Sequence, residues 1–291
     1  MIAVDLGQSG CRISIDGKIH SSNRGKLAGE SVLVSLEENF KKIDAKSKLV
    51  TLSLTGLFGF VENTQDYLEL CSKYFGAIEV AVIDDGLASL AGSLAGQPGV
   101  ALTLGGGVVA VGGNGQALSH SDGLGSVFGD EGGGFWLGSR GLTRALAARD
   151  GRTNAPELLN IFADELNAFD ALSSKNGTEA TSLAIACARK VLEANVDSTN
   201  QIVAEGAGYL AMTVVSAWKK VGSINEPFKL TISGGLSKND NYRKLIFDKI
   251  KTLGAKADLV EAAGDNLDGA IWIALNQKED IAPMLGWAKI Q

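Results

Sequence analysis

The 291-residue sequence contains little proline, cysteine or histidine: four prolines, three cysteines and two histidines. So few prolines exclude a collagen-like chain and a proline-rich disordered segment. The cysteines, Cys11, Cys71 and Cys187, lie far apart and form no C-x-x-C pair. A zinc site, an iron–sulfur cluster or a disulfide framework is therefore not expected, and a reducing compartment fits best.

The chain also lacks an excess of basic residues and a long hydrophobic run. It carries 27 Lys and Arg against 33 Asp and Glu, a net charge of -6. This balance argues against a protein that binds the nucleic-acid backbone, which needs clustered positive charge. No apolar run of about 18 residues is free of glycine or charge, and the N-terminus has no basic segment typical of a secretory signal. We therefore expect a cytoplasmic protein that binds neither nucleic acid nor a membrane.

Glycine, by contrast, is abundant, with 37 residues. This is nearly twice its share in an average protein. Because glycine has no side chain to bury, the excess indicates unusual backbone conformations or backbone that another group approaches closely. Fifteen of the 37 glycines lie between Gly99 and Gly141.

The hydrophobic pattern alternates between strand-like and helix-like segments, which predicts an α/β fold. Strands are predicted at residues 2–6, 12–15, 18–21, 49–54, 77–83, 228–233 and 256–260. Helices are predicted at residues 30–43, 65–75, 86–95, 135–148, 182–193, 199–221, 241–253 and 267–275. The segment 96–99, Gly-Gln-Pro-Gly, is the clearest linker signal.

After this linker the opening of the chain recurs at an offset of 98 residues. The segment 5–9 matches 103–107, and the turn Asp16-Gly17 falls on Asn114-Gly115. Two matches in register favour an internal duplication. We therefore expect two α/β domains, residues 1–97 and a larger 98–291 with a helical insertion, and a ligand in the cleft between them. The final residues either stay with the second domain or pack back on the first.

The glycine-rich loops match neither of the common phosphate-binding motifs. A P-loop is absent because the pairs Gly17-Lys18 and Gly25-Lys26 are followed by Ile and Leu. A Rossmann loop leads into a helix, whereas Gly105–Gly107 leads into the strand-like residues 108–111. Glycines at a strand-to-strand turn allow backbone N–H groups to point at an anion, although a plain hairpin remains the alternative.

Carboxylates near strand ends favour the anion-binding interpretation. Asp5 lies two residues before Gly7, a position from which it can hold a hydrated Mg²⁺ ion. Asp84 and Asp85 follow an apolar strand and precede a helix, so that one can cap the helix and leave the other free. Asp130 and Glu131 precede the helix predicted at 135–148, and N-capping is expected to explain one of them.

Several segments resemble, in order along the chain, the motifs of one group of ATPases. They are Asp5-Leu6-Gly7-Gln8-Ser9 for the first phosphate motif D-G-G-G-T, Ile83-Asp84-Asp85-Gly86 for N-D-A, Leu104-Gly105-Gly106-Gly107-Val108 for S-G-T-G-S, Gly123-Leu124-Gly125 with Gly129-Asp130-Glu131-Gly132 for G-W-G…G-D-E-G, Ser233-Gly234-Gly235 for the adenosine motif, and Gly269-Ala270 for the last helix. The sequence thus resembles the sugar kinase, Hsp70 and actin superfamily. It is most similar to N-acetylglucosamine kinase and the related BadF/BadG-type ATPases.

The resemblance implies two duplicated ribonuclease-H-like (actin-like ATPase) domains, ATP and Mg²⁺ as cofactors, a sugar substrate and a homodimer. Asp85 takes the place of the catalytic aspartate, and Asp5 would position the metal. The residues implied to bind nucleotide are Asp5, Gly7, Gln8, Ser9, Gly105, Gly106, Gly107, Gly234, Gly235 and Gly269. The residues implied to bind sugar are Asp85, Gly106, Gly125, Asp130 and Glu131.

The implied activity is an ATP-dependent kinase for an amino sugar, N-acetylglucosamine or glucosamine, at the C6 hydroxyl. Asp85 would accept the proton of that hydroxyl. The second phosphate motif departs from the family pattern, since Leu104, Gly106 and Val108 replace its hydroxyl residues, and Leu124 replaces the tryptophan of G-W-G. A regulatory or activator-type ATPase without sugar kinase activity is therefore the alternative. The dehydratase-activator subtype is disfavoured because it needs an iron–sulfur cysteine pair.

Overall fold

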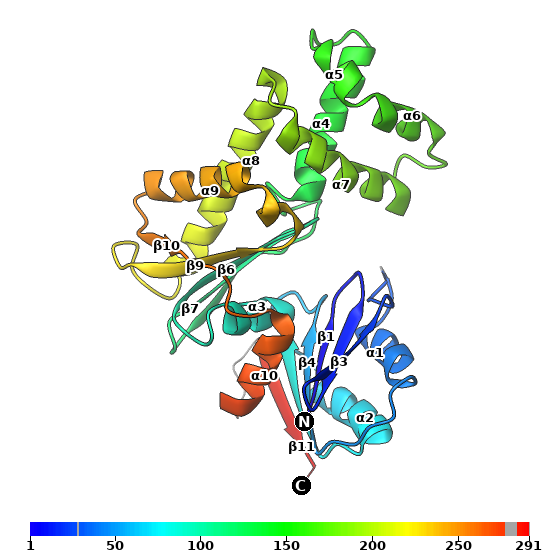
Figure 1. The fold of residues 1–291 in the computed structure, drawn as a ribbon, viewed down its shortest axis with the longest axis vertical. Coiled ribbons are helices and arrows are strands. Elements are labelled where there is room, and N and C mark those ends of the chain that lie inside the picture. The colour runs from blue at the N-terminus through cyan, green and yellow to red at the C-terminus, as the bar shows by residue number, and fades with distance from the viewer. Residues whose placement is uncertain (28, 277–283, 291) are drawn as a thin grey trace. The chain divides into compact units, whose positions relative to one another are not determined.

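The computed structural model describes residues 1–27, 29–276 and 284–290, which form two compact units (Figure 1). Unit 1 consists of Met1–Ala101 and Glu261–Gln291, and unit 2 of Leu102–Val260. The first change of unit lies close to the boundary expected at residues 97 and 98. The C-terminal segment from Glu261 groups with unit 1 because its strand β11, Leu285–Lys289, pairs antiparallel with β5, Glu79–Asp84.

Unit 1 is built on a six-stranded mixed sheet in the order β11-β5-β4-β1-β2-β3. Its remaining strands are β1 (Ile2–Leu6), β2 (Cys11–Ile15), β3 (Lys18–Ser22) and β4 (Leu49–Leu54). Its helices are α1 (Val32–Phe40), α2 (Thr64–Phe75), α3 (Asp85–Ser93) and α10 (Asn266–Asn276).

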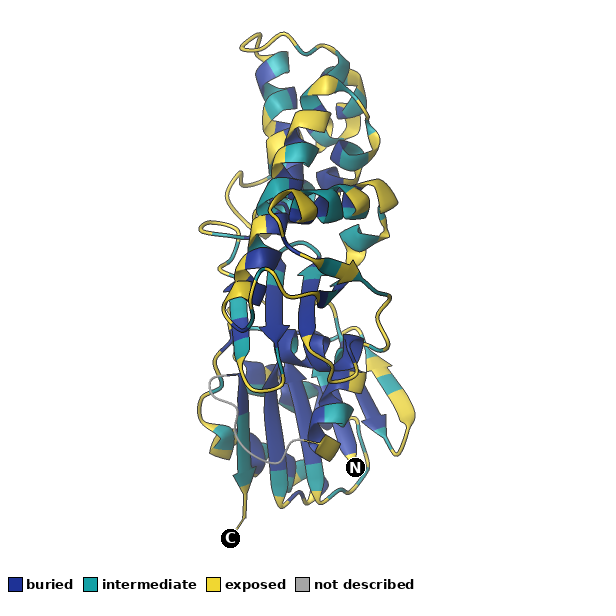
Figure 2. Ribbon diagram, turned by 90° about the vertical axis from the view of Figure 1, so that its left-hand side faces the viewer, coloured by how far each residue is buried: buried dark blue, intermediate teal, exposed yellow. Residues whose placement is uncertain are grey.

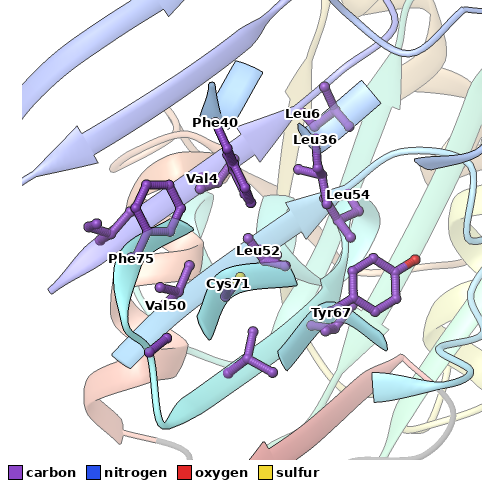
Figure 3. Packing of buried hydrophobic residues seen from close by; sticks show 14 of the residues in the cluster. Val4, Leu6, Leu36, Phe40, Val50, Leu52, Leu54, Tyr67, Cys71 and Phe75 are labelled. Carbon is purple, nitrogen blue, oxygen red and sulfur yellow. The ribbon is translucent and has the colours of Figure 1, made fainter. Parts of the chain in front are cut away.

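Alternation along the strands of unit 1 separates its apolar core from its polar groups. Val4 and Leu6 of β1 point to the face covered by α1 and α2, where they pack with Leu52, Phe40 and Phe75 (Figure 3). Because successive side chains in a strand point to opposite faces, the intervening residues of β1 point away from this core. The fold therefore directs Asp5 to the face on which α10 packs against β1 and β4.

Unit 2 contains a five-stranded sheet in the order β10-β9-β6-β7-β8 and a group of helices. Its strands are β6 (Gly99–Leu104), β7 (Val108–Gly113), β8 (Leu118–Asp122), β9 (Phe228–Ser233) and β10 (Ala257–Leu259). Its helices are α4 (Gly134–Arg149), α5 (Glu157–Ile161), α6 (Ala163–Ala171), α7 (Thr178–Glu193), α8 (Asp197–Lys219), the short 3₁₀ helix η1 (Gly235–Lys238) and α9 (Asp240–Thr252).

The two sheets repeat the same strand order, which confirms the predicted duplicated α/β fold. The order β5-β4-β1-β2-β3 in unit 1 corresponds to β10-β9-β6-β7-β8 in unit 2. The tight turn after the second strand is repeated too, with positive φ at Gly17 and at Gly115. In both sheets the central strands are buried, as Figure 2 shows in dark blue, whereas the edge strand β3 is largely exposed.

Two features of unit 2 differ from the sequence-based expectation. The helices α5 and α6 occupy a segment for which no helix was predicted. The expected N-cap of α4 by Asp130 or Glu131 is wrong, because the N-cap residue is Gly133 and no side chain caps it. Among the helices of the described ranges, none is long and apolar enough to cross a membrane.

Candidate active site

The first candidate phosphate loop is a tight turn between β1 and β2. The backbone N–H of Gly7 donates to the carbonyl of Gly10 over 2.9 Å, and the N–H of Lys26 donates to the carbonyl of Gly7, also over 2.9 Å. Gly25 lies directly against the turn, since a Cβ on Gly25 would come within 2.2 Å of the Gln8 carbonyl oxygen. Gln8 and Ser9 are exposed at the tip. This close backbone contact fixes the shape of the turn.

Asp5 is held by two neighbours that the sheet register places beside it. Arg12 is its antiparallel partner on β2, and Ser53 is its parallel partner on β4. Arg12 donates to Asp5 Oδ2 from Nη2 (2.6 Å) and Nε (3.2 Å), while the Ser53 hydroxyl donates to Oδ1 (3.1 Å). Arg12 Nη1 also donates to Asp265 Oδ2 over 2.5 Å, just before α10.

Asp84 and Asp85 divide the two roles that the sequence left open between them. Asp84 is the buried N-cap of α3, and its carboxylate accepts hydrogen bonds from the backbone N–H groups of Gly86 (3.0 Å) and Gly59 (2.9 Å). Asp85 is the first residue of α3 and accepts a hydrogen bond from the Thr55 hydroxyl. The fold thus commits Asp84 to structure and leaves Asp85 available for chemistry.

The pKa of Asp85 is strongly shifted. Burial in its surroundings, followed by the negative charge of Asp84, raises the pKa of Asp85 to about 7. The hydrogen bond from Thr55 opposes this shift only in part, and the charge of Asp5 adds to it. A carboxylate with a pKa near 7 is matched to proton abstraction at neutral pH.

The second candidate phosphate loop, Gly105–Gly107 between β6 and β7, is tied to the start of α4. The carbonyls of Gly105 and Gly106 accept hydrogen bonds from the N–H groups of Gly134 (2.8 Å) and Phe135 (2.9 Å). These bonds satisfy N–H groups of the first turn of α4, which have no partner within the helix. The loop therefore caps α4 in place of an acidic side chain.

Asp130 supports this loop from its other side. Its Oδ1 accepts a hydrogen bond from the Val108 N–H over 3.0 Å, and its own N–H donates to Asp122 Oδ1 over 2.8 Å. Burial raises the pKa of Asp130, the bond from Val108 opposes the shift and the charge of Asp122 adds to it. Glu131 is exposed and Gly125 is half-buried. One carboxylate oxygen of Asp130 is thus engaged by the backbone of the loop.

Two of the glycines implied to bind nucleotide are required by packing within their own unit. A Cβ on Gly234, which has a φ of +96°, would lie 2.4 Å from the Leu104 carbonyl oxygen, so the segment after β9 lies beside the start of the second loop. A Cβ on Gly269 would lie only 1.8 Å from the Ala88 carbonyl oxygen, where α10 crosses α3 (Figure 1). The structure therefore supplies a packing reason for both glycines.

Other glycines have no such explanation among the described residues of their own unit. Side chains at Gly105 and Gly235 would meet nothing within 4 Å, and at Gly7 only the Gly10 carbonyl at 3.8 Å. None of the three has the positive φ that favours glycine. Glycines that neither packing nor conformation requires fit backbone that a ligand approaches closely.

Asp5 has little capacity to bind Mg²⁺ directly. Both oxygens of Asp5 already accept hydrogen bonds, from Arg12 and Ser53. Within residues 1–27, 29–276 and 284–290, no group of three or more His, Cys, Asp or Glu residues is placed to hold a metal ion. Mg²⁺ typically keeps several waters and binds through one or two carboxylates and substrate phosphates. Asp5 therefore fits contact with the ion through water.

The sequence did not single out four residues that shape the unit 1 part of this site. They are Arg12, Ser53, Thr55 and Gly25. The only signal for Ser53 and Thr55 was their place at the end of a predicted strand next to the first one in a parallel sheet. Arg12 and Gly25 had no signal, because their contacts depend on register and on loop packing.

The duplicated three-stranded meander, with a glycine turn in each unit, places the protein in the class of actin-like two-domain folds. The chain belongs to the BadF/BadG/BcrA/BcrD ATPase family, whose model matches residues 8–272.

Relatives with kinase names share this fold. The chain is 26% identical over 209 residues to the N-acetylmuramic acid/N-acetylglucosamine kinase of Clostridium acetobutylicum. The matched region covers 68% of each protein. It resembles the structure of a proposed N-acetylglucosamine kinase from Chromobacterium violaceum, with a TM-score of 0.65, 24% identity and coverage of 93% and 96% of the two chains. The ROK hexokinase of Thermus thermophilus has a TM-score of 0.57, 17% identity and coverage of 96% and 99%.

Proposed function

We propose that the protein is an ATP-dependent kinase that phosphorylates an amino sugar, N-acetylglucosamine or glucosamine, at the C6 hydroxyl. The observation that carries this proposal is the state of Asp85. It begins α3, receives a hydrogen bond from Thr55 and has a pKa raised to about 7. Such a group can accept the proton of a sugar hydroxyl as the oxygen attacks phosphorus. The named activity of the Clostridium relative supports the choice of substrate class.

The chain's residues would divide the work by unit. In unit 1, the turn around Gly7, Gln8 and Ser9 would bind phosphate through backbone N–H groups, and Asp5 would orient the metal through water. In unit 2, the glycines at 105–107 and 234–235 would allow the nucleotide to approach the backbone, while Gly125, Asp130 and Glu131 would contact the sugar. ATP supplies the phosphoryl group and Mg²⁺ neutralises part of its charge when both are bound. A homodimer remains a prediction.

The proposal is tested by measuring ADP release from ATP with a panel of hexoses and hexosamines. We expect stimulation by N-acetylglucosamine or glucosamine and little ADP release without sugar. Glucose and galactose serve as controls for the need for an amino substituent. Release that none of the sugars changes would contradict the kinase assignment.

A regulatory ATPase is the second candidate, and a specific feature of unit 2 favours it. The loop 105–107 carries no hydroxyl side chain, two of its carbonyls bond to α4, and Asp130 Oδ1 bonds to Val108. This arrangement leaves few free polar groups near the loop that could bind the hydroxyl groups of a sugar. The same assay separates the two, because a regulatory ATPase releases ADP without sugar.

A further inference from the structure

Lys26 in unit 1 combines partial burial with the lack of a counter-charge among the described residues. Its side chain is half-buried, yet within the described ranges its Nζ makes no hydrogen bond or ion pair. Its neighbour Arg24 is fully engaged, with Nη2 donating to Glu30 Oε1 (2.5 Å) and Nη1 to the Gly25 carbonyl (2.6 Å). Arg12 likewise forms ion pairs with Asp5 and Asp265. Of these three cations beside the first glycine turn, only Lys26 is free to bind an anion.

The backbone fixes where Lys26 lies. Its N–H donates to the Gly7 carbonyl, and the preceding Gly25 packs so tightly that a Cβ there would lie 2.6 Å from the Gly10 nitrogen. A Cβ on Gly10 would in turn lie 2.6 Å from the Ser22 carbonyl oxygen. Because Gly10 and Gly25 both lack a Cβ, the two backbone segments can approach closely, and residue 26 lies against the turn. Its position is set by backbone packing.

The side chain of Lys26 extends from this turn toward the residues around Asp85. A Cβ on Gly56 would lie 2.9 Å from Lys26 Cε and 3.4 Å from Nζ. Gly56 follows Thr55, whose hydroxyl bonds to Asp85 and whose N–H donates to the Leu6 carbonyl over 3.0 Å. The ammonium group therefore lies beside Gly56, the residue that follows Thr55.

Negative charge collects at this end of the sheet, so that an unpaired ammonium group here can assist the binding of an anion. Asp5, Asp84 and Asp85 are close enough for the charges of Asp5 and Asp84 to raise the pKa of Asp85. A phosphate group that approaches these carboxylates is repelled unless a cation offsets the repulsion. Lysine suits this task as a point charge with three donors.

We propose that Lys26 binds the terminal phosphate of ATP, together with the backbone N–H groups of the turn at Gln8 and Ser9. This inference rests on the proposed function, because it assigns a ligand to a residue of the same site. If Lys26 is instead a solvated surface lysine, ATP and ADP should bind alike with and without its charge. The proposed contact requires the terminal phosphate, which ATP has and ADP lacks.

The first test compares ATP and ADP binding by calorimetry for the wild type, Lys26→Met and the control Lys18→Met. Methionine keeps an apolar chain as far as Cε, which packs against Gly56, but removes the charged amine. Lys18 is an exposed lysine on β3 of the same unit. We expect Lys26→Met to weaken ATP binding about tenfold or more, the usual scale for a charged hydrogen bond. ADP binding should stay unchanged, and Lys18→Met should bind both like the wild type. Unchanged ATP affinity, or equal losses for ATP and ADP, would overturn the inference.

A second test needs no variant. ATP should protect Lys26 of the wild type, but not Lys18, from reductive methylation followed by peptide mass spectrometry, and ADP should protect it less. Equal labelling with and without ATP would refute the contact.

These outcomes separate the two proposals. If ADP release proves independent of sugar while Lys26→Met selectively loses ATP, the kinase assignment fails and the inference stands. If a sugar is phosphorylated while Lys26→Met binds ATP normally, the inference fails and the kinase assignment stands. A wild type that does not bind ATP refutes both.

Discussion

The glycine turns of the two units come from the same duplicated meander, but their surroundings differ. The turn between β1 and β2 lies among ionisable side chains, with Asp5 and Arg12 at its base and Lys26 against its backbone. The turn between β6 and β7 lies among backbone groups, since its carbonyls bond to the N–H groups of α4. One acidic side chain, Asp130, holds it in place.

The comparison shows that the strand order of the meander is repeated, whereas the turns differ in length: residues 7–10 link β1 to β2 and residues 105–107 link β6 to β7. Charged groups gather around the turn of unit 1, where burial raises the pKa of Asp85 to about 7. Unit 2 offers close backbone approach at Gly105 and Gly235 instead. On this account, changes in unit 1 should affect chemistry, and changes in the unit 2 turn should affect binding or stability.

The largest effect is expected for Asp85→Asn in unit 1. The amide keeps the size of the side chain but cannot accept a proton, so turnover with the preferred sugar should fall at least about 100-fold, the scale of a general base. ATP affinity measured by calorimetry should persist. Asp44→Asn, an exposed change in the same unit, is the matched control.

The pH profile sharpens this prediction. Only ionised Asp85 can act as a base, so kcat/KM of the wild type should fall as the pH drops through about 7. The residual activity of Asp85→Asn should lack this limb. Near-normal turnover of the variant, or an unchanged limb, would remove Asp85 from the role.

The next effect compares Gly269 and Gly105, which the family resemblance both implies to bind the nucleotide. Gly269→Ala places a Cβ 1.8 Å from the Ala88 carbonyl oxygen, so it should lower the free energy of unfolding by about 1–3 kcal/mol or more. Gly105→Ala meets no atom within 4 Å, so it should leave stability unchanged and weaken ATP binding. Denaturant unfolding and calorimetry measure the two effects. Equal stability of both variants would show that the packing argument is wrong.

The smallest effect is expected at Asp130 in unit 2. Asp130→Ala leaves the Val108 N–H without its acceptor and should cost about 1–2 kcal/mol in the free energy of unfolding. Asp130→Asn keeps a carbonyl acceptor and should be nearly as stable as the wild type. If Asp130 contacts the sugar as proposed, the asparagine variant should raise the KM for sugar without changing the KM for ATP. An unchanged KM for sugar would restrict Asp130 to supporting the loop.

Local patterns were sufficient to predict much of the fold. The three opening strands were predicted to within one residue because short strand-like segments flank Asp16-Gly17, a common hairpin turn. The positive φ of both residues agrees with a tight hairpin. The strand β11 was not predicted as a strand, since its partner β5 lies about 200 residues earlier in the chain. A short segment with a distant partner carries little local signal.

The candidate site shows the same limit. The sequence predicted Asp5, Asp85 and the glycine turns as candidate site residues, because each lies at or just after the end of a strand. It could not predict that Arg12 bonds to Asp265, which is 253 residues away. Nor could it show that Asp130 bonds to the backbone of the glycine turn in place of capping α4. These contacts are set by tertiary packing.

Transfer of label from ATP carrying a radioactive γ-phosphate tests the central claim most directly. The protein is incubated with labelled ATP, Mg²⁺ and N-acetylglucosamine or glucosamine, and the products are separated. The account predicts that the label appears in a sugar 6-phosphate and that Asp85→Asn nearly abolishes this product. Label that appears only as inorganic phosphate, at a rate independent of sugar, would contradict it.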